Sequence, residues 1–249
     1  MGTRRIVRDL AICLRTRPLR ESSKLVTLFT RSNGRVTGIA KGARRPKNRF
    51  GAALEPFALA ELTWHWHQQK TIYTISDSAL VTGHPGIAAE PARFLAAEQV
   101  GEFLLRTIGD HDPNEQLWQL ARTYLVEIER ADDRLPALVL SFLLKGASFL
   151  GFRPEVRSCL GCGRPVAAGP DRWRFDTRRG GAVCPECGVA PDAPEIETAL
   201  LARLANLLYS PAAGLVPQAA DPALLELVRE FLSHHLEALR LNSLNWREL

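Results

Sequence analysis

The sequence predicts an α+β protein of several domains, in which a small five-stranded β-barrel is followed by an all-α bundle with an inserted four-cysteine zinc finger. Three observations predict this fold class. Apolar residues alternate along short segments of the first 80 residues, they recur at helical spacing further on, and two Cys-x-x-Cys pairs interrupt the helical part. A chain of 249 residues is long enough to give each part a core.

Short strands account for the first 80 residues. Each has apolar residues two apart or is rich in β-branched and aromatic residues, and Ser32-Asn33-Gly34 is typical of a tight hairpin turn. The expected strands are residues 6–14, 24–31, 35–42, 57–66 and 71–80. A small antiparallel barrel of these strands would leave no open sheet edge.

Helical periodicity begins after Gly86. The expected helices are residues 91–109, 114–131, 135–152, 194–210 and 221–241. The third is apolar nearly all round and should lie at the centre of the bundle, and the last starts with Asp221 as N-cap and Pro222 in the first turn. We expect a barrel domain at 1–82, a helical domain at 83–156 and 193–249, and the zinc finger at 157–192.

Positive charge is concentrated at the N-terminal end. Residues 1–50 hold 14 Lys and Arg and two acidic residues, whereas the rest of the chain holds 18 basic and 25 acidic residues. This first block therefore carries +12 in a chain whose net charge is +5. Such an asymmetry favours a polyanionic partner, and specifically a nucleic acid, over a surface that is merely solvated.

The densest part of this block is KGARRPKNRF, residues 41–50, which we call the basic loop. Gly42 and Pro46 argue against a helix and predict a flexible loop that leaves a strand. Such a loop can follow a phosphate backbone without reading bases, and aromatic side chains beside it can stack on bases. The aromatic candidates, some of which must be core residues, are Phe29, Phe50, Trp64, Trp66 and Tyr73.

Four of the five cysteines have the spacing of a zinc site. Cys159 and Cys162 are followed, after 21 residues, by Cys184 and Cys187. Two such pairs can wrap one tetrahedral Zn²⁺, and four thiolates leave no open position for water, so a structural zinc is expected. Two alternatives compete with zinc. Two disulfides would need an oxidising compartment, and nothing in the sequence indicates secretion. A redox dithiol would be expected beside a βαβ unit, which the pattern of predicted elements lacks. Cys13 lies between Ile12 and Leu14 on a predicted strand and is expected to be a core residue.

No signature of catalysis occurs in the sequence. It lacks a G-x-S-x-G elbow, a G-x-x-x-x-G-K-[ST] phosphate loop and an H-E-x-x-H motif. His65 and His67 would lie on one strand face and could share a metal, although a solvated face is the commoner reason for this spacing. His234 and His235 are adjacent in a helix and therefore point in different directions. We expect a protein that is not an enzyme.

The chain has no predicted membrane segment. The most apolar run, Leu135 to Leu144, is far shorter than the roughly 20 residues of a membrane-spanning helix. The N-terminus lacks the apolar region of a signal peptide. A soluble, cytoplasmic protein is expected.

The run GRVTGIAKGARRPKNRFGAALEPF, from Gly34 to Phe57, closely resembles the signature of the bacterial RecO family of recombination and DNA-repair mediators. The preceding LFTRSNG, from Leu28 to Gly34, fits as well. The resemblance implies an OB-fold barrel that binds single- and double-stranded DNA non-specifically and anneals complementary strands. It also implies partnership with RecR and with single-stranded DNA-binding protein in loading RecA at gaps, at a cytoplasmic, nucleoid-associated location.

Carried over to this sequence, the resemblance assigns DNA binding to the cations of the matching motif. These are Arg35, Lys41, Arg44, Arg45, Lys47 and Arg49, with Lys24 and Arg31 as additions from the strand before it. Four arginines of the finger either extend this surface or are simply solvated: Arg172, Arg174, Arg178 and Arg179. The alternative hypothesis is a protein adaptor, in which the helical bundle and the finger dock partner proteins and DNA contact is incidental.

Overall fold

A computed structural model describes the chain at residues 4–131, 133–188, 193–217 and 221–236. Contacts divide the chain into two units, Met1–Arg130 and Ala131–Leu249. Among the described residues, the strands of the N-terminal part lie in the first unit together with three helices, and the two cysteine pairs lie in the second. The domain boundaries expected from the sequence, after residue 82 and around the finger at 157–192, stay predictions.

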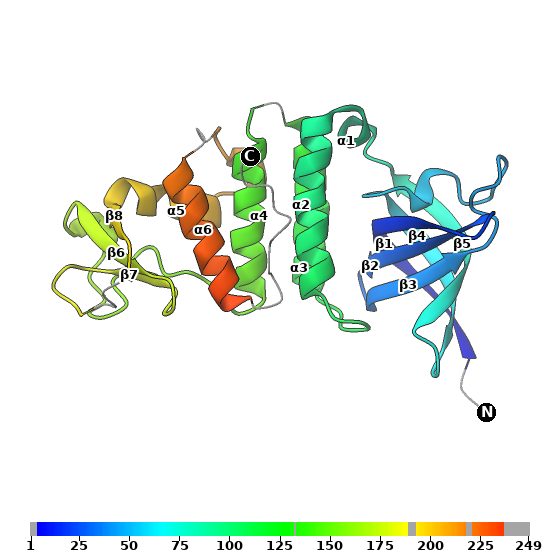
Figure 1. The fold of residues 1–249 in the computed structure, drawn as a ribbon, viewed down its shortest axis with the longest axis horizontal. Helices are drawn as coiled ribbons and strands as arrows, with labels where there is room; N and C mark the ends of the chain where they lie inside the picture. Colours follow the sequence, from blue (N-terminus) through cyan, green and yellow to red (C-terminus); the bar gives the residue numbers. More distant parts are fainter. Residues whose placement is uncertain (1–3, 132, 189–192, 218–220, 237–249) are drawn as a thin grey trace. The chain divides into compact units, whose positions relative to one another are not determined.

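Five strands of the first unit, within its described residues, form a closed barrel in the order β1-β2-β3-β5-β4, and β4 pairs back onto β1 (Figure 1). Their bounds are β1 Arg4–Leu19, β2 Ser23–Thr30, β3 Gly34–Ala40, β4 Leu59–His67 and β5 Ile72–Thr82. Alternate residues point inward, so Leu28, Leu62 and Trp64 are buried in the barrel core.

The barrel differs from the expected antiparallel one at a single pair among these strands. β3 and β5 run parallel, with Gly38 opposite Tyr73. Parallel neighbours need a long connection, and here the basic loop, a short 3-10 helix η1 (Gly51–Leu54) and β4 lie between them in the chain. β1 is also longer than predicted, and an irregularity between Cys13 and Arg15 interrupts its register.

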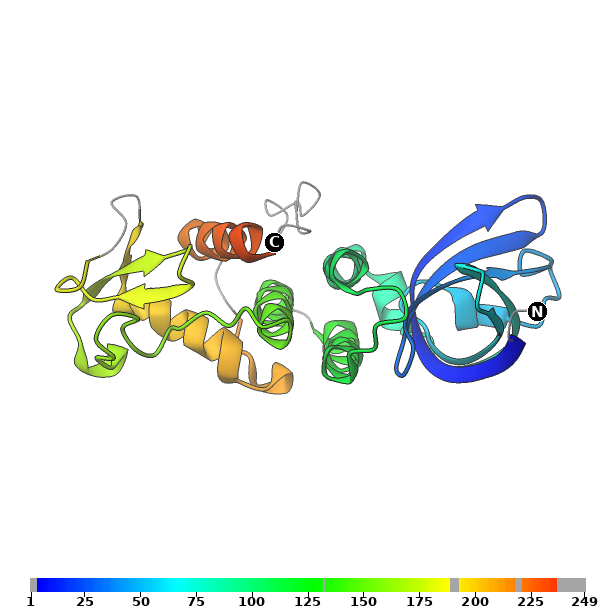
Figure 2. The same ribbon diagram turned by 90° about the horizontal axis from the view of Figure 1, so that it is seen from below.

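Helices α1 (Pro85–Ala89), α2 (Pro91–Thr107) and α3 (Glu115–Arg130) complete the first unit, and α2 and α3 run side by side next to the barrel (Figures 1 and 2). The buried Trp118 of α3 donates from Nε1 to the carbonyl oxygen of Phe29 on β2, 3.1 Å away. The Phe94 ring of α2 meets the edge of the Phe57 ring, with the centroids 5.7 Å apart. The helices therefore bury the side of the barrel that they contact.

The connection between α2 and α3 covers the predicted hairpin turn. Gly34 has φ +64°, which suits the Asn-Gly turn, and a Cβ at this position would lie 2.4 Å from the backbone nitrogen of Asp112. Arg35 donates its backbone N–H to the Gly109 carbonyl oxygen at 3.1 Å. Glycine is therefore needed here for two reasons, the conformation and the close approach of a second backbone.

In the second unit, α5 (Thr198–Tyr209) and α6 (Pro222–His235) pack against α4 (Leu135–Phe149), which is buried nearly all round, as its sequence predicts. The hydroxyl of Ser141 on α4 donates to the carbonyl oxygen of Leu207 on α5. A three-stranded sheet in the order β7-β6-β8 adjoins these helices, with bounds β6 Arg172–Asp176, β7 Gly181–Val183 and β8 Glu195–Glu197.

The expected helices are present with shifted ends. The helix predicted to start at residue 194 begins at Thr198, because residues 195–197 pair with β6 as a strand. The last helix starts as predicted, with Asp221 Oδ1 accepting the Ala223 N–H at 2.9 Å, and residues 237–241 of that prediction lie outside the described residues. Of the helices in the described ranges, none is long and apolar enough to cross a membrane.

Candidate nucleic-acid interface and metal site

The basic loop (residues 41–50) is anchored to the barrel by backbone hydrogen bonds and buried side chains. Its backbone turns at Gly42, which has φ +76°, and Arg45 donates its N–H to the Gly42 carbonyl oxygen at 3.0 Å. The side chains of Ala43 and Phe50 are buried in the barrel core. The loop therefore enters the core near both of its ends.

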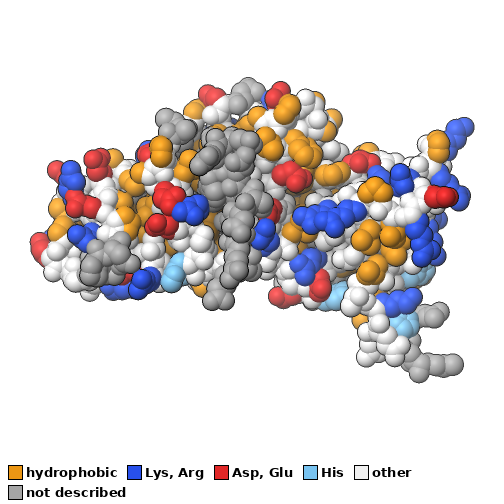
Figure 3. Space-filling model, viewed as in Figure 1, with side chains coloured by type: hydrophobic (Ala, Val, Ile, Leu, Met, Phe, Trp, Pro, Cys, Tyr) orange, Lys and Arg blue, Asp and Glu red, His pale blue; other side chains and the backbone are white. Residues whose placement is uncertain are grey.

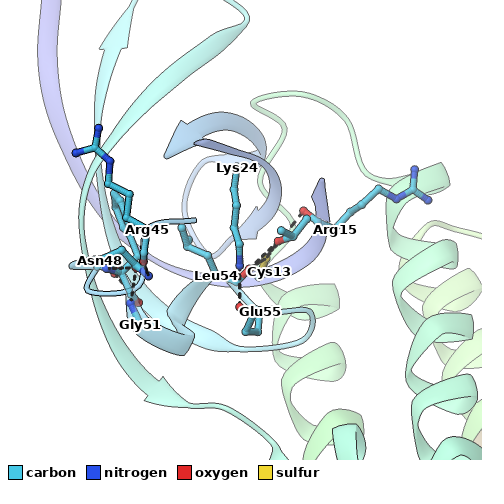
Figure 4. Close-up of polar contacts among 11 residues, drawn as sticks. Cys13, Arg15, Lys24, Arg45, Asn48, Gly51, Leu54 and Glu55 are labelled. Carbon is cyan, nitrogen blue, oxygen red and sulfur yellow. Dashed lines mark hydrogen bonds and ion pairs between the residues drawn. The ribbon is translucent and has the colours of Figure 1, made fainter. Parts of the chain in front are cut away.

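Two polar side chains complete this anchoring. Arg44 donates from Nη1 to the carbonyl oxygens of Arg20 and Glu21, at 2.8 and 3.1 Å, in the turn between β1 and β2. Asn48 accepts the N–H groups of Phe50 and Gly51 at its Oδ1, at 2.9 and 3.0 Å (Figure 4). The expected flexible loop is thus a defined turn whose outward side chains start from fixed backbone positions.

The remaining cations of the basic loop face solvent. All four are exposed, and among the described residues none has a hydrogen bond or an ion pair through its charged group: Lys41, Arg45, Lys47 and Arg49. Figure 4 shows the Arg45 guanidinium pointing away from the loop. Figure 3 shows further Lys and Arg side chains over the barrel.

A groove of about 890 Å³ runs between the basic loop and the turn that joins β1 to β2. Lys41, Gly42 and Arg45 line one side, and Leu19 and Arg20 line the other. Arg20 was not among the residues singled out from the sequence. Its place beside the basic loop follows from the pairing of β2 with β3, which brings the two connections together at one end of the barrel.

The other three cations predicted to bind DNA are held by acidic side chains of the first unit. Lys24 Nζ lies 2.7 Å from Glu55 Oε1 (Figure 4), and Arg35 Nε lies 2.6 Å from Asp110 Oδ1. Arg31 pairs with Glu115 at the start of α3 at 2.5 Å. Arg31 and Arg35 lie away from the basic loop, at the end of the β2–β3 hairpin that the α2–α3 connection covers. Lys24 lies opposite Ala40, next to the start of the basic loop, but its charge is held by Glu55.

Most of the aromatic candidates are core residues. Phe29, Phe50, Trp64 and Tyr73 are each at most 3% exposed. Trp66 is half-buried, and Arg5 places its guanidinium 4.7 Å from the centroid of the Trp66 ring. Of the five, Trp66 alone can offer a ring to a ligand in the described structure.

The four predicted zinc ligands come together in the second unit. The sulfur atoms of Cys159, Cys162, Cys184 and Cys187 all lie within 4.8 Å of one another, and in the described residues this is the cluster of side chains able to hold a metal. Sulfurs that sit 2.3 Å from a tetrahedral ion are about 3.8 Å apart, and Cys162 and Cys184 are separated by 3.7 Å. A disulfide needs about 2.05 Å, so these are free thiols arranged for one ion.

The backbone around the cluster favours thiolates. Burial raises the pKa of the Cys159 thiol, but N–H groups of Cys184, Cys162 and Gly161 outweigh it and lower this pKa to about 6. The N–H groups of Gly161 and Cys184 lie 3.3 and 3.2 Å from the Cys159 sulfur. Hydrogen bonds with the other three thiols raise the pKa of Cys187. Binding of a metal by all four residues would release their remaining protons.

The two cysteine pairs are also joined by side chains and by close packing. A Cβ at Gly161 would lie 2.8 Å from the Cys187 sulfur, so only glycine leaves room for the ligand set to close. Arg164, just after the first pair, forms an ion pair through both terminal nitrogens with Glu186, which lies inside the second pair. β6 and β7 form an antiparallel hairpin between the pairs.

The arginines of the finger and the remaining histidines lie outside these two sites. Arg172 pairs with Glu195 at 2.6 Å, and Arg179 Nη2 lies 3.4 Å from the Leu160 carbonyl oxygen. Cys13 is buried as expected, and burial raises its pKa to about 11. His65 and His67 do not join a metal cluster with other described side chains. Instead, both line a cavity beside Trp66.

Comparison with known proteins covers nearly the whole chain. The family described as Recombination protein O N terminal matches residues 4–84, and Recombination protein O C terminal matches residues 89–245. A DNA repair protein RecO from Anaeromyxobacter sp. is 34% identical over 87% of this chain and 86% of its own length. The DNA repair protein RecO from Myxococcus xanthus is 33% identical over 92% of this chain and 91% of its own length. The one from Nocardioides sp. is 34% identical over 93% of this chain and 95% of its own length. The chain therefore belongs to the RecO family of DNA repair proteins.

Proposed function

We propose that this protein is a recombination mediator that binds single- and double-stranded DNA without reading sequence, anneals complementary strands, and acts with RecR and single-stranded DNA-binding protein to load RecA at single-stranded gaps. The observation that carries the proposal is the anchored basic loop, which has four exposed cations, two of which, Lys41 and Arg45, border a groove of about 890 Å³. Membership of a DNA repair family supports DNA as the polyanion. No covalent step is part of this function.

The barrel is proposed to be an OB-fold. Its strand order, with β4 returning to β1 and β3 parallel to β5, supports a small five-stranded barrel of this type. OB-folds bind oligonucleotides on a strand face and its flanking loops. The basic loop and the β1–β2 turn supply such a flank here, with Arg20 and Arg45 on its two sides.

Binding is proposed to divide the predicted cations into two groups. Lys41, Arg45, Lys47 and Arg49 contact phosphates, because their charges face solvent. Lys24, Arg31, Arg35 and Arg44 add to the positive potential while holding the barrel, the loop and the helices in place. Each phosphate contact releases counterions, so affinity should depend steeply on salt.

Annealing follows from the same charge. Two single strands repel each other in solution, and a basic surface that binds both lowers this repulsion and raises their local concentration. Contacts to phosphates alone leave the base edges free to find their complements.

The four cysteines are proposed to hold one structural Zn²⁺. The ion would cross-link the two cysteine pairs and supply folding energy to the finger, with no open position for chemistry. The metal-dependent fold should extend to the neighbouring sheet, because Leu160 donates its N–H to the Ala182 carbonyl oxygen on β7 at 2.9 Å.

A salt-titrated binding assay with the full chain tests the DNA proposal. The variant replaces Arg45, Lys47 and Arg49 with Gln, and a matched control replaces three exposed arginines of helices α3 and α6, Arg122, Arg130 and Arg229. Both lose three charges. Only the loop variant should lose affinity for single-stranded DNA, with a decrease of about 2 in the slope of log K against log salt.

Equal losses in the two variants would show that net charge, rather than the basic loop, determines binding. If both variants and the wild type bound DNA weakly while partner proteins were still captured, the adaptor hypothesis would replace this one. Zinc is tested separately: metal analysis should find one equivalent per chain, and Cys184→Ser should lower it and expose the finger to proteolysis.

A further inference from the structure

A second cavity lies on the barrel, away from the residues of the basic loop. It has a volume of about 330 Å³, within the range of about 300 to 1,000 Å³ typical of small-ligand sites. Its lining comes from the start of β1, the end of β4 and the hairpin that leads into β5: Arg5, Ile6, His65, Trp66, His67, Lys70 and Thr74.

The polar lining of this cavity suits an anion. Arg5 and Lys70 are exposed cations, and none of the described residues that line the cavity carries a carboxylate. The backbone N–H of Gln69 donates to His67 Nδ1 at 3.2 Å. In the neutral ring the proton is therefore on Nε2, which leaves His67 an N–H that can donate to a phosphate oxygen.

The apolar lining suits a flat ring. Ile6 is 69% exposed, and its strand partner is His65. The Trp66 ring is held in place, because it is half-buried and packs against the core of the barrel. Arg5 stacks over the same ring at 4.7 Å. A pre-positioned Trp with an Arg over its face is a platform for a nucleobase, which can stack on either group.

We propose that this cavity is a subsite for one unpaired nucleotide, whose base stacks on the Trp66–Arg5 pair and whose phosphate meets His67 and Lys70. The proposal rests on the proposed function and deepens it, because it gives the barrel a contact that only single-stranded DNA can make. A base inside a duplex has both faces covered by its neighbours and does not stack on a side chain. The subsite therefore separates single from double strands, while the basic loop serves both.

The test compares single-stranded oligo-dT of about 15 nucleotides with a duplex that carries the same number of phosphates, both bound by the full chain. Trp66→Leu should lower affinity for the single strand by about 5- to 150-fold, the range for loss of one stacked base, and leave affinity for the duplex unchanged. Trp66→Phe should restore most of the loss, since it keeps a ring. Lys70→Gln should reduce the single-strand salt slope by about 0.7.

A direct readout does not depend on any variant folding. Single-stranded DNA carrying 5-iodouracil, irradiated on the wild-type chain, should crosslink to the peptide that holds Trp66. Equal losses for single strand and duplex in Trp66→Leu, or crosslinks that map only to residues 41–50, would overturn the subsite and leave the proposed function intact. A wild-type chain that bound neither DNA would instead refute the proposed function itself.

Discussion

Arg44 donates from Nη1 to the carbonyl oxygen of Arg20, 2.8 Å away, and so ties the basic loop to the turn between β1 and β2. Arg44 lies between cations that face solvent, yet its guanidinium bonds to the protein's own backbone. We therefore expect Arg44→Leu to lower both the melting temperature and DNA affinity. Loss of charged hydrogen bonds at an exposed site should cost about 1 kcal/mol, or about 2 to 4 °C.

The neighbouring Arg45→Leu is the matched control for Arg44. It removes the same charge without breaking a side-chain bond, so DNA affinity should fall while the melting temperature stays within about 1 °C of wild type. Thermal unfolding and DNA titration of the two variants check this. An equal effect of both substitutions on stability would contradict the anchoring role.

Substitutions at Gly34 and Gly51 should distinguish the cost of an unfavourable backbone conformation from the cost of a steric clash. Both have positive φ, +64° and +51°. A Cβ at Gly34 would meet the Asp112 backbone at 2.4 Å, whereas a Cβ at Gly51 would have no atom of the described residues within 4 Å. Gly51→Ala should cost about 1 kcal/mol, the conformational cost alone. Gly34→Ala should cost at least about 2 kcal/mol more, because the α2–α3 connection must move. Denaturant unfolding of both variants measures the difference.

The thiols should react in two classes. With zinc bound, we expect none of the five cysteines to react quickly with a thiol reagent at neutral pH. A chelator should release the four sulfurs of the cluster, while Cys13 stays protected by burial and by its pKa of about 11 until the chain unfolds. Fast reaction of five thiols after chelation would mean that zinc also maintains the barrel.

Glu129 should make the free energy of unfolding depend on pH in the acid range. Burial raises its pKa, but hydrogen bonds with His84 and the Gly86 N–H outweigh this and hold the pKa below its ordinary value of 4.5. The stabilisation is therefore present above pH 4.5 and is lost as the pH falls through the lower folded-state pKa. Glu129→Gln should be less stable than wild type at pH 7, and this difference should shrink below about pH 4. A constant difference would contradict the linkage.

Local patterns predicted the parts of this fold that local interactions determine. The helices that start near residues 91, 114 and 135 could be predicted because their apolar residues repeat at helical spacing. The cysteine cluster could be predicted because each Cys-x-x-Cys pair is a short local motif. The strand at 195–197 was missed, since three residues beside a helix show no period of their own.

Long-range pairing set the limits of prediction. The parallel β3–β5 pair joins segments separated by a whole strand, and nothing in either segment specifies that direction. Charge counting could not separate Arg35 from Arg45 either. The acidic partner of Arg35 lies 75 residues away, and only the folded chain brings Asp110 to it. The cavity at Trp66 could not be predicted either, because its lining residues come from β1, β4 and β5 and meet only in the folded chain.

The bond from Trp118 to the carbonyl oxygen of Phe29 bears on how the protein can be dissected. A fragment cut at the end of β5 would expose the rings of Phe29 and Phe57 and leave that oxygen without its indole donor. Such a fragment should aggregate, and weak DNA binding by it would reflect lost stability rather than a missing interface. Dissection of this protein should therefore cut after Arg130, where the first unit ends.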